Sequence, residues 1–388
     1  MKYDFDKIIE RRGSGAIKCD ALGKFFGKDD LIPMWVADMD FESAPPVVKA
    51  IQERAAHPYF GYPYTLELLK DHIVAHYKKK YKVTVRPEWI VWVPSVIPGV
   101  VTALQMMGSK FMYSIPMYDH IRNLHNEAKL PVVEVPMKRD ESTYRYTMDM
   151  DALEAVLSPD IKSLILCNPH NPVGRVYTKE ELLRLEAFCT RHHLLVISDE
   201  IHCELDLEDR HIPYFSVSDD AAAYSVTVSS AGKICNIPGL PLGFAIIPNE
   251  TLREKFASRQ DGLLPCANVI TIAAYEKAYD GSCDGWKEEL REYLRANRDY
   301  AEARFAKIPE IRTPHNEGTY LLWLDCSALG TEDPADFFLK KAHVKVSSGK
   351  IYGYSRYVRF NYGCPRAQLE EAIDRMEHAV EVWRALKK

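Results

Sequence analysis

Short apolar runs separated by helical patterns constrain the fold of this chain more than any other feature. A helical pattern at 98–107 follows the first run, and another at 179–193, opened by Thr178 as its N-cap, lies between two later ones. The runs lie at 90–93, 111–115, 131–135, 163–167, 194–198, 224–228 and 243–247. Continuous apolar strands separated by helices are typical of a mixed, mostly parallel sheet with helices on both faces. The sequence therefore predicts an α/β fold.

The pattern changes near residue 286, which indicates a second structural unit. A long, charged amphipathic helix begins there, and short strands and a last helix from about residue 366 follow it. A chain of 388 residues is also longer than one hydrophobic core usually serves. We predict a large domain at 46–285 and a smaller α+β domain built from residues 1–45 and 286–388.

Composition excludes several classes of protein. The net charge of -5 gives no reason to expect nucleic acid or a membrane surface as a partner. There is no apolar run long enough to span a membrane, and residues 1–13 are charged and lack the apolar core of a secretory signal. The nine cysteines are dispersed, without the paired spacing of a zinc site or a disulfide framework. We therefore expect a cytoplasmic protein with reduced thiols and no metal.

Polar residues follow four of the predicted strands. They are Ser95 before a helix start, Asn168 and Asn171, Asp199 and His202, and Lys233. In an open parallel sheet, ligands bind beyond the carboxyl ends of the strands. We therefore expect these groups to meet along one edge of the sheet.

Each of these signals also has an ordinary structural interpretation. A lysine after a strand is usually exposed to solvent, and an aspartate there is usually a helix N-cap or a loop residue. The segment before the helix at 98 would, without a ligand, be an ordinary turn. In combination they fit one chemistry. A buried lysine forms Schiff bases with carbonyls, a carboxylate can keep a heteroaromatic nitrogen protonated, and a helix start binds phosphate. Pyridoxal phosphate requires this combination.

Motifs spread over nearly the whole sequence carry a family resemblance. They include LIPMWVADMDFESAPPVV (31–48), FGYPY (60–64), NPHNPVGRV (168–176), SDEIH (198–202), GKICNIPGL (232–240) and VRFNYGCPR (358–366). The chain resembles the fold-type I pyridoxal-phosphate enzymes, and within them the MalY/PatB group of cystathionine β-lyases and cysteine-S-conjugate β-lyases. The resemblance implies pyridoxal 5'-phosphate as the cofactor.

The resemblance also assigns roles around the cofactor ring. Lys233 matches the Schiff-base lysine, and Asp199 matches the aspartate that pairs with the ring nitrogen. Asn171 matches the amide on the phenolic oxygen, and Tyr118 matches the aromatic side chain that stacks on the ring. His202 lies near the polar edge of the cofactor in a supporting role.

Further residues match the phosphate and substrate sites of the family. The amides of Val96 and Ile97 match the phosphate cradle, with Ser230 as a hydroxyl donor. Tyr62 matches a tyrosine that reaches the phosphate bound by the neighbouring subunit, which implies a homodimer. The substrate residues are Arg359, which matches the arginine on the α-carboxylate, and Ala37, in the segment that lines this side.

The implied reaction is elimination from cystathionine or a cysteine conjugate, which releases a thiol, pyruvate and ammonia. The same residues would serve an aminotransferase acting on an L-amino acid, so this alternative stays open. A regulatory protein that binds pyridoxal phosphate is a third possibility. The chain also departs from the family pattern, because Gly232 stands where members usually carry serine. The segments 105–115 and 353–359 are shorter than in the family, which leaves the substrate preference open.

Overall fold

The computed structural model describes residues 2–27, 30–63, 66–261 and 267–387. Its largest sheet has seven strands in the order β2-β10-β9-β8-β7-β3-β4. The strands are β2 (Ile90–Val93), β3 (Lys110–Ile115), β4 (Val132–Pro136), β7 (Ile161–Cys167), β8 (Leu195–Asp199), β9 (Ser225–Ser229) and β10 (Gly243–Ile246). Strand β10 runs opposite to the other six strands of this sheet. The prediction of a mixed, mostly parallel sheet is confirmed.

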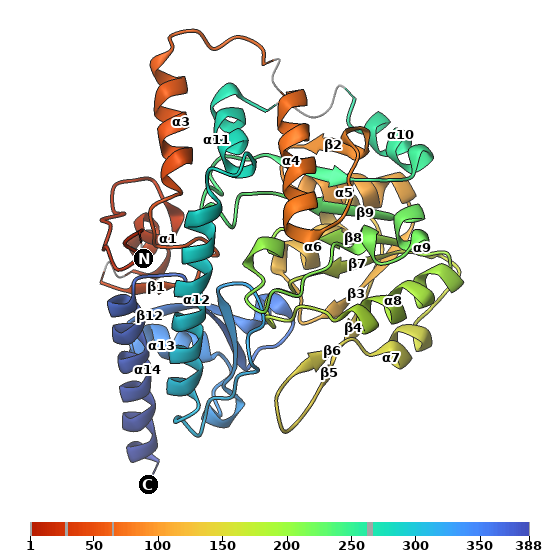
Figure 1. Cartoon of the computed structure of the whole chain (residues 1–388). Helices are drawn as coiled ribbons and strands as arrows, with labels where there is room; N and C mark the ends of the chain where they lie inside the picture. Colours follow the sequence, from red (N-terminus) through yellow and green to blue (C-terminus); the bar gives the residue numbers. More distant parts are fainter. Residues whose placement is uncertain (1, 28–29, 64–65, 262–266, 388) are drawn as a thin grey trace.

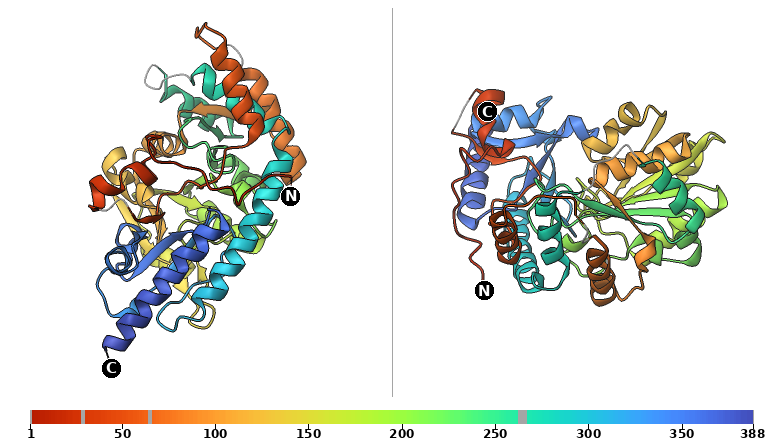
Figure 2. Two further views of the ribbon diagram at one scale, coloured as in Figure 1. Left: turned by 90° about the vertical axis from the view of Figure 1, so that its left-hand side faces the viewer. Right: turned by 90° about the horizontal axis from the view of Figure 1, so that it is seen from above.

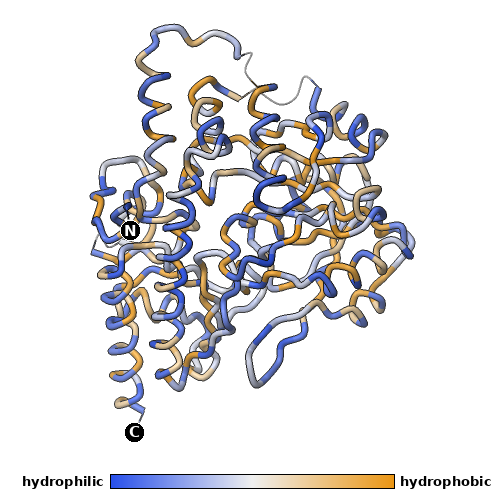
Figure 3. The backbone as a smooth tube through the Cα atoms, in the orientation of Figure 1, coloured by the Kyte–Doolittle hydropathy of each residue, from blue (hydrophilic) through white to orange (hydrophobic). Residues whose placement is uncertain are grey.

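Helices cover both faces of this sheet (Figure 1). One face packs against α5 (Val96–Met107), α6 (Asp119–Ala128) and α10 (Glu250–Ser258). The opposite face packs against α7 (Met150–Ala155), α8 (Lys179–Arg191) and α9 (Asp219–Ala223). Along β7, Leu164 and Leu166 belong to one of these cores and Ile165 to the other, as the two-residue period of a strand requires. Burial on both faces explains why residues 164–167 of this strand are all apolar. Figure 3 shows hydrophobic segments running through the region of the large sheet.

Two helix starts determine where polar groups lie. Thr178 caps α8 as predicted, because its hydroxyl accepts the Glu181 amide and the Glu181 carboxylate accepts the Thr178 amide. Helix α5 begins at Val96, two residues before the predicted start at 98. Pro98 is compatible with the first turn, where a missing N–H costs no hydrogen bond. The earlier start makes the amides of Val96 and Ile97 the first two of the helix.

A second sheet has the order β1-β12-β13-β11. Its strands are β1 (Ile32–Met34), β11 (Leu321–Asp325), β12 (Val344–Ser348) and β13 (Tyr357–Asn361), and its neighbours include α13 (Pro334–Lys341) and α14 (Arg366–Leu386). Strand β1 thus joins a sheet whose other strands all follow residue 320. Figure 2 shows this unit beside the large sheet from two directions. The domain boundaries at residues 46 and 285 stay a prediction.

The structure has further helices, and a small two-stranded sheet formed by β5 and β6. They are α1 (Ile17–Asp20), α2 (Leu22–Phe26), α3 (Pro45–Ala56), α4 (Leu66–Tyr81), α11 (Val269–Tyr279), α12 (Asp284–Phe305), β5 (Lys138–Arg139) and β6 (Tyr146–Thr147). The predicted long helix near residue 286 is α12. Within the described residues, no helix is long and apolar enough to cross a membrane.

Candidate active site

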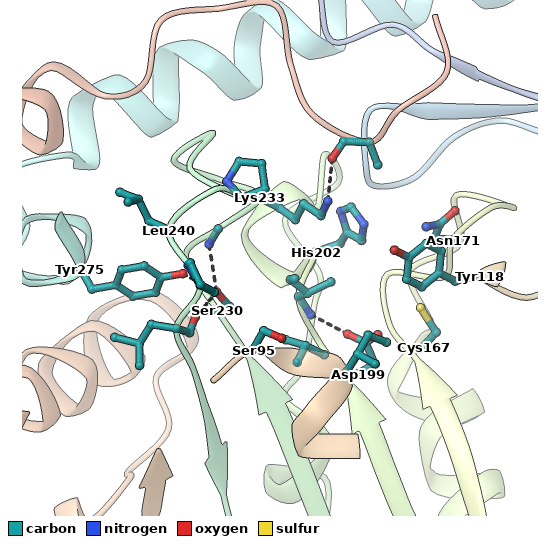
Figure 4. A pocket seen from close by; sticks show the side chains of 18 residues that line it. Ser95, Tyr118, Cys167, Asn171, Asp199, His202, Ser230, Lys233, Leu240 and Tyr275 are labelled. Atoms are coloured by element: carbon teal, nitrogen blue, oxygen red, sulfur yellow. Dashed lines mark hydrogen bonds between the residues drawn. The ribbon is translucent and has the colours of Figure 1, made fainter. Parts of the chain in front are cut away.

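Two adjoining cavities lie beyond the carboxyl ends of the strands in the large sheet. The inner cavity has a volume of about 180 Å³, and the outer cavity of about 1130 Å³ opens from it. The predicted residues that line the inner cavity are Ala37, Val96, Ile97, Tyr118, Asn171, Asp199, His202, Ser230 and Lys233 (Figure 4). Arg359 lines the outer cavity together with Ala37, Tyr118 and Lys233. The structure therefore brings together all the predicted site residues except Tyr62.

Lys233 lies where the two cavities join. Its Nζ donates a hydrogen bond to the Ala37 carbonyl oxygen at 2.6 Å. Burial, together with the nearby Arg359 charge, lowers the pKa of Lys233 to about 8. Ala231 and Gly232, the residues before it, are small and buried. The lowered pKa makes the amine easier to deprotonate than an exposed lysine, and no bulky side chain precedes it.

Asp199 is the last residue of β8 and only 3 % of its surface is exposed. Its Oδ1 accepts the amide of Ile201 at 3.1 Å. Burial raises the pKa of Asp199 to about 6, because the charged form loses solvation. A buried carboxylate with one backbone donor has the capacity to accept a further N–H, such as that of a protonated pyridine.

His202 is also buried, and its Nδ1 has no hydrogen-bond partner among the described residues. Burial lowers the pKa of His202 well below its usual range, and the charge of Lys233 acts in the same direction. The ring packs edge-on against Tyr320 at a centroid distance of 6.0 Å. His202 is therefore a neutral group at the cavity wall.

One end of the inner cavity is suited to an anion. The first amides of a helix have no acceptor within the helix, and α5 directs those of Val96 and Ile97 toward this end. Ser95 and Ser230 also line the cavity. A helix start at one end, with a lysine, a buried carboxylate and an amide around the rest, fits the phosphate, aldehyde, ring nitrogen and phenolic oxygen of pyridoxal phosphate.

Arg359 is buried on β13, which lies between β12 and β11 and is not an edge strand. Its guanidinium donates to Asn171 Oδ1 at 3.2 Å and to the Trp35 carbonyl at 3.0 Å. Its Nε is buried and has no hydrogen-bond partner in the part of the chain that the structure describes. Tyr352 packs against the guanidinium, 4.9 Å from the ring centroid. Because Asn171 Oδ1 accepts from Arg359, the NH₂ group of Asn171 remains a donor.

Two buried tyrosines in this region, Tyr275 and Tyr320, were not among the predicted site residues. Tyr320 donates to the same Ala37 carbonyl as Lys233, at 2.8 Å. Tyr275, on α11, lines the inner cavity. Neither follows one of the strand ends from which the site was inferred, so no local signal identified them.

Tyr62 lies outside both cavities and is fully exposed. It lines a separate shallow pocket with Arg54, Ile272 and Glu276. Tyr59 and Phe60, just before it, are 70 % and 60 % exposed. A single chain therefore carries an exposed aromatic segment away from its own cofactor cavity.

Comparison with known proteins gives the family. Residues 29–376 match the family Aminotransferase class I and II. The chain is 35 % identical to cystathionine beta-lyase PatB of Bacillus subtilis, over 97 % of this chain and 100 % of the relative. It is 31 % identical to Protein MalY of Escherichia coli, over 98 % and 100 % of the two chains.

Solved structures agree with this assignment. A pyridoxal-phosphate-bound putative aminotransferase from Clostridium difficile superposes with a TM-score of 0.93 at 32 % identity, over 97 % of this chain and 100 % of that one. The pyridoxal-phosphate-bound C-S lyase from Staphylococcus hominis gives a TM-score of 0.89 at 29 % identity, over 97 % and 98 %. The chain belongs to the aminotransferase class I and II family and has the fold-type I architecture. Within this family it is a pyridoxal-phosphate-dependent carbon–sulfur β-lyase of the MalY/PatB type.

Proposed function

We propose that this enzyme eliminates a thiol from cystathionine or a related cysteine conjugate and releases pyruvate and ammonia. The observation that carries the proposal is the placement of Lys233 and Arg359 around one cavity junction, with Asp199 buried behind it. Relatives named cystathionine beta-lyase support the choice of substrate class.

Each residue has a separate task in this reaction. Pyridoxal phosphate, when bound, links covalently to an amine and withdraws electrons from the carbon next to it. Lys233 would hold the cofactor aldehyde through its amine; once the substrate amine has replaced it there, the released lysine would remove the Cα proton as a general base. Asp199 would keep the ring nitrogen protonated, and Asn171 would donate to the phenolic oxygen. Tyr118 would pack on the ring face.

An assay with cystathionine distinguishes lyase from aminotransferase chemistry. We expect pyruvate and ammonia to appear in equal amounts, without conversion of an added keto acid. Formation of a new amino acid from the added keto acid, without pyruvate, would instead identify an aminotransferase. Binding of the cofactor without turnover of either kind would favour the regulatory alternative.

Arg359 should determine how the substrate carboxylate is bound. A guanidinium binds a carboxylate with two parallel hydrogen bonds, whereas a lysine ammonium is a point charge. We expect Arg359→Lys to lower kcat/KM for cystathionine by about 10- to 100-fold, or about 1.4–2.8 kcal/mol. Steady-state kinetics measures this change.

A decarboxylated substrate provides the control for Arg359→Lys. Binding of the corresponding amine, followed by the cofactor absorbance, should be nearly the same in the variant and in the unchanged enzyme. An equal loss for both ligands would mean that Arg359 does not bind the carboxylate.

We also propose that the protein is a homodimer in which Tyr62 completes the phosphate site of the partner subunit. The exposed segment of Tyr59, Phe60 and Tyr62 supports this, because contiguous exposed aromatic side chains mark interfaces. The eight cysteines that the structure describes are free thiols, in keeping with the predicted cytoplasmic location.

Mixing two inactive variants tests the shared site. Lys233→Ala and Tyr62→Phe damage different halves of it, so each heterodimer should contain one site with both residues intact. We expect activity to recover after subunit exchange at limiting cofactor. Mixing Lys233→Ala with Tyr59→Phe is the matched control for an exposed tyrosine outside the site. If the Tyr62→Phe mixture stays as inactive as its components, each chain builds its site alone.

A further inference from the structure

The buried hydroxyl of Tyr275 has no role in the site described so far. We propose that this hydroxyl binds the phosphate of pyridoxal phosphate, at the place where Gly232 provides no side-chain hydroxyl. The inference rests on the pyridoxal-phosphate dependence of the enzyme and concerns how the chain holds that cofactor.

Tyr275 lies beside the place where a side chain at position 232 would project. The tyrosine is 1 % exposed and comes from α11, outside the strand ends that form the rest of the cavity. A Cβ atom added at Gly232 would lie 3.6 Å from the Tyr275 hydroxyl and 3.3 Å from Ser230 Oγ. Figure 4 shows the phenol directed toward Ser230, at the end of the cavity that Ser95 also lines. The phenol therefore brings a hydroxyl to the region that a serine at 232 would occupy.

The hydrogen bonds of Ser230 identify Tyr275 as the available donor. Ser230, which the family resemblance gives as a phosphate donor, here donates its only Oγ proton to the Leu242 carbonyl at 2.7 Å and accepts the Gly232 amide at 3.1 Å. Tyr275 lies 2.8 Å from the same Oγ, and because the serine proton is already used, Tyr275 is the donor of this pair. Its O–H can rotate from Ser230 to a phosphate oxygen, after which Ser230 keeps its other two hydrogen bonds.

The small number of positive charges in the inner cavity makes a hydrogen-bond donor at Tyr275 important for binding the phosphate. Among the described residues that line the inner cavity, Lys233 is the only lysine or arginine, and its amine is needed for the cofactor aldehyde. The phosphate charge is then balanced by the start of α5 and by neutral donors, and a hydrogen bond to a charged group is stronger than one between neutral groups. Burial raises the pKa of Tyr275, so the phenol remains a proton donor at physiological pH.

A comparison of two ligands tests the proposal independently of catalysis. Full-length protein freed of cofactor is titrated with pyridoxal phosphate and with pyridoxal, which lacks the phosphate. In Tyr275→Phe the preference for pyridoxal phosphate, expressed as the ratio of the two dissociation constants, should fall about 10- to 100-fold. The affinity for pyridoxal should stay nearly unchanged. An unchanged ratio, or an equal loss of affinity for both ligands, would overturn the proposal.

Two further variants make the test specific. Tyr279→Phe removes a buried hydroxyl one turn along the same helix, outside the cavity, and should leave the ratio unchanged. Gly232→Ser in the Tyr275→Phe background should restore most of the lost preference, because the new hydroxyl enters the same region. A ratio that stays low in this double variant would contradict the equivalence of the two positions. Lyase activity is not used as a readout, so an error in the substrate assignment would leave the result unaffected.

Discussion

Replacing Lys233 by alanine is expected to abolish the visible absorbance of the lysine-bound cofactor and to remove the general base. General bases contribute about 10²- to 10⁴-fold to enzymatic rates, so kcat should fall by a factor of at least about 10². The physical reason is the position of the amine, which is held 2.6 Å from the Ala37 carbonyl with a pKa lowered to about 8. Absorbance spectra and elimination kinetics of the purified variant measure both effects.

Lys49 provides a matched control for this variant. It also lines the outer cavity, but it is exposed and pairs with Glu53. Lys49→Ala should keep the absorbance and nearly the full rate. Borohydride reduction followed by peptide mapping identifies the attached lysine directly, and a label on any residue other than Lys233 would refute the assignment.

Replacing Asp199 by asparagine should slow elimination by several orders of magnitude while the cofactor stays bound. An amide cannot hold the pyridine nitrogen protonated, and a neutral ring withdraws electrons from Cα much less effectively. The substitution hardly changes the size of the side chain, which is 3 % exposed, so a defect in packing should be small. Cofactor content and kcat, measured on the same preparation, separate binding from catalysis.

The neighbouring Glu200 is the control for charge at this strand end. It is fully buried but does not line either cavity, and its carboxylate accepts from the Ser198 hydroxyl and the Tyr214 amide. Glu200→Gln keeps an oxygen acceptor and should retain most of the activity. Near-normal turnover in Asp199→Asn, or a loss as large in Glu200→Gln, would be incompatible with the proposed role of Asp199.

The large sheet and most of the residues that line the cavity could be predicted from the sequence, because both depend on local signals. Strands buried on both faces are apolar throughout, and parallel strands direct the residues after them to one edge, where Asp199 and Lys233 lie. Resemblance to a family, and not periodicity, gave the roles of Tyr118, Asn171 and Arg359. Burial of Arg359 on an interior strand could not be read from the residues around it, since it depends on how β11 and β12 pair with β13.

The contacts that escaped sequence reasoning join distant segments. The Ala37 carbonyl accepts from both Lys233 and Tyr320, which lie 196 and 283 residues further along the chain. Tyr275 faces the cavity from a helix that is apolar over most of its length, so no polar pattern singled it out. Only the three-dimensional packing reveals which face of such a helix meets the cofactor site.

The pairing of β1 with β12 has a consequence for how the enzyme is made. These strands, Ile32–Met34 and Val344–Ser348, flank the whole large sheet in the sequence. During synthesis, β1 therefore cannot pair with β12 until more than three hundred further residues have been translated. The strands that carry Asp199 and lead to Lys233 are complete long before then. Asp199 and Lys233, which we propose bind the cofactor, are therefore synthesised well before Arg359, which is translated only near the end of the chain.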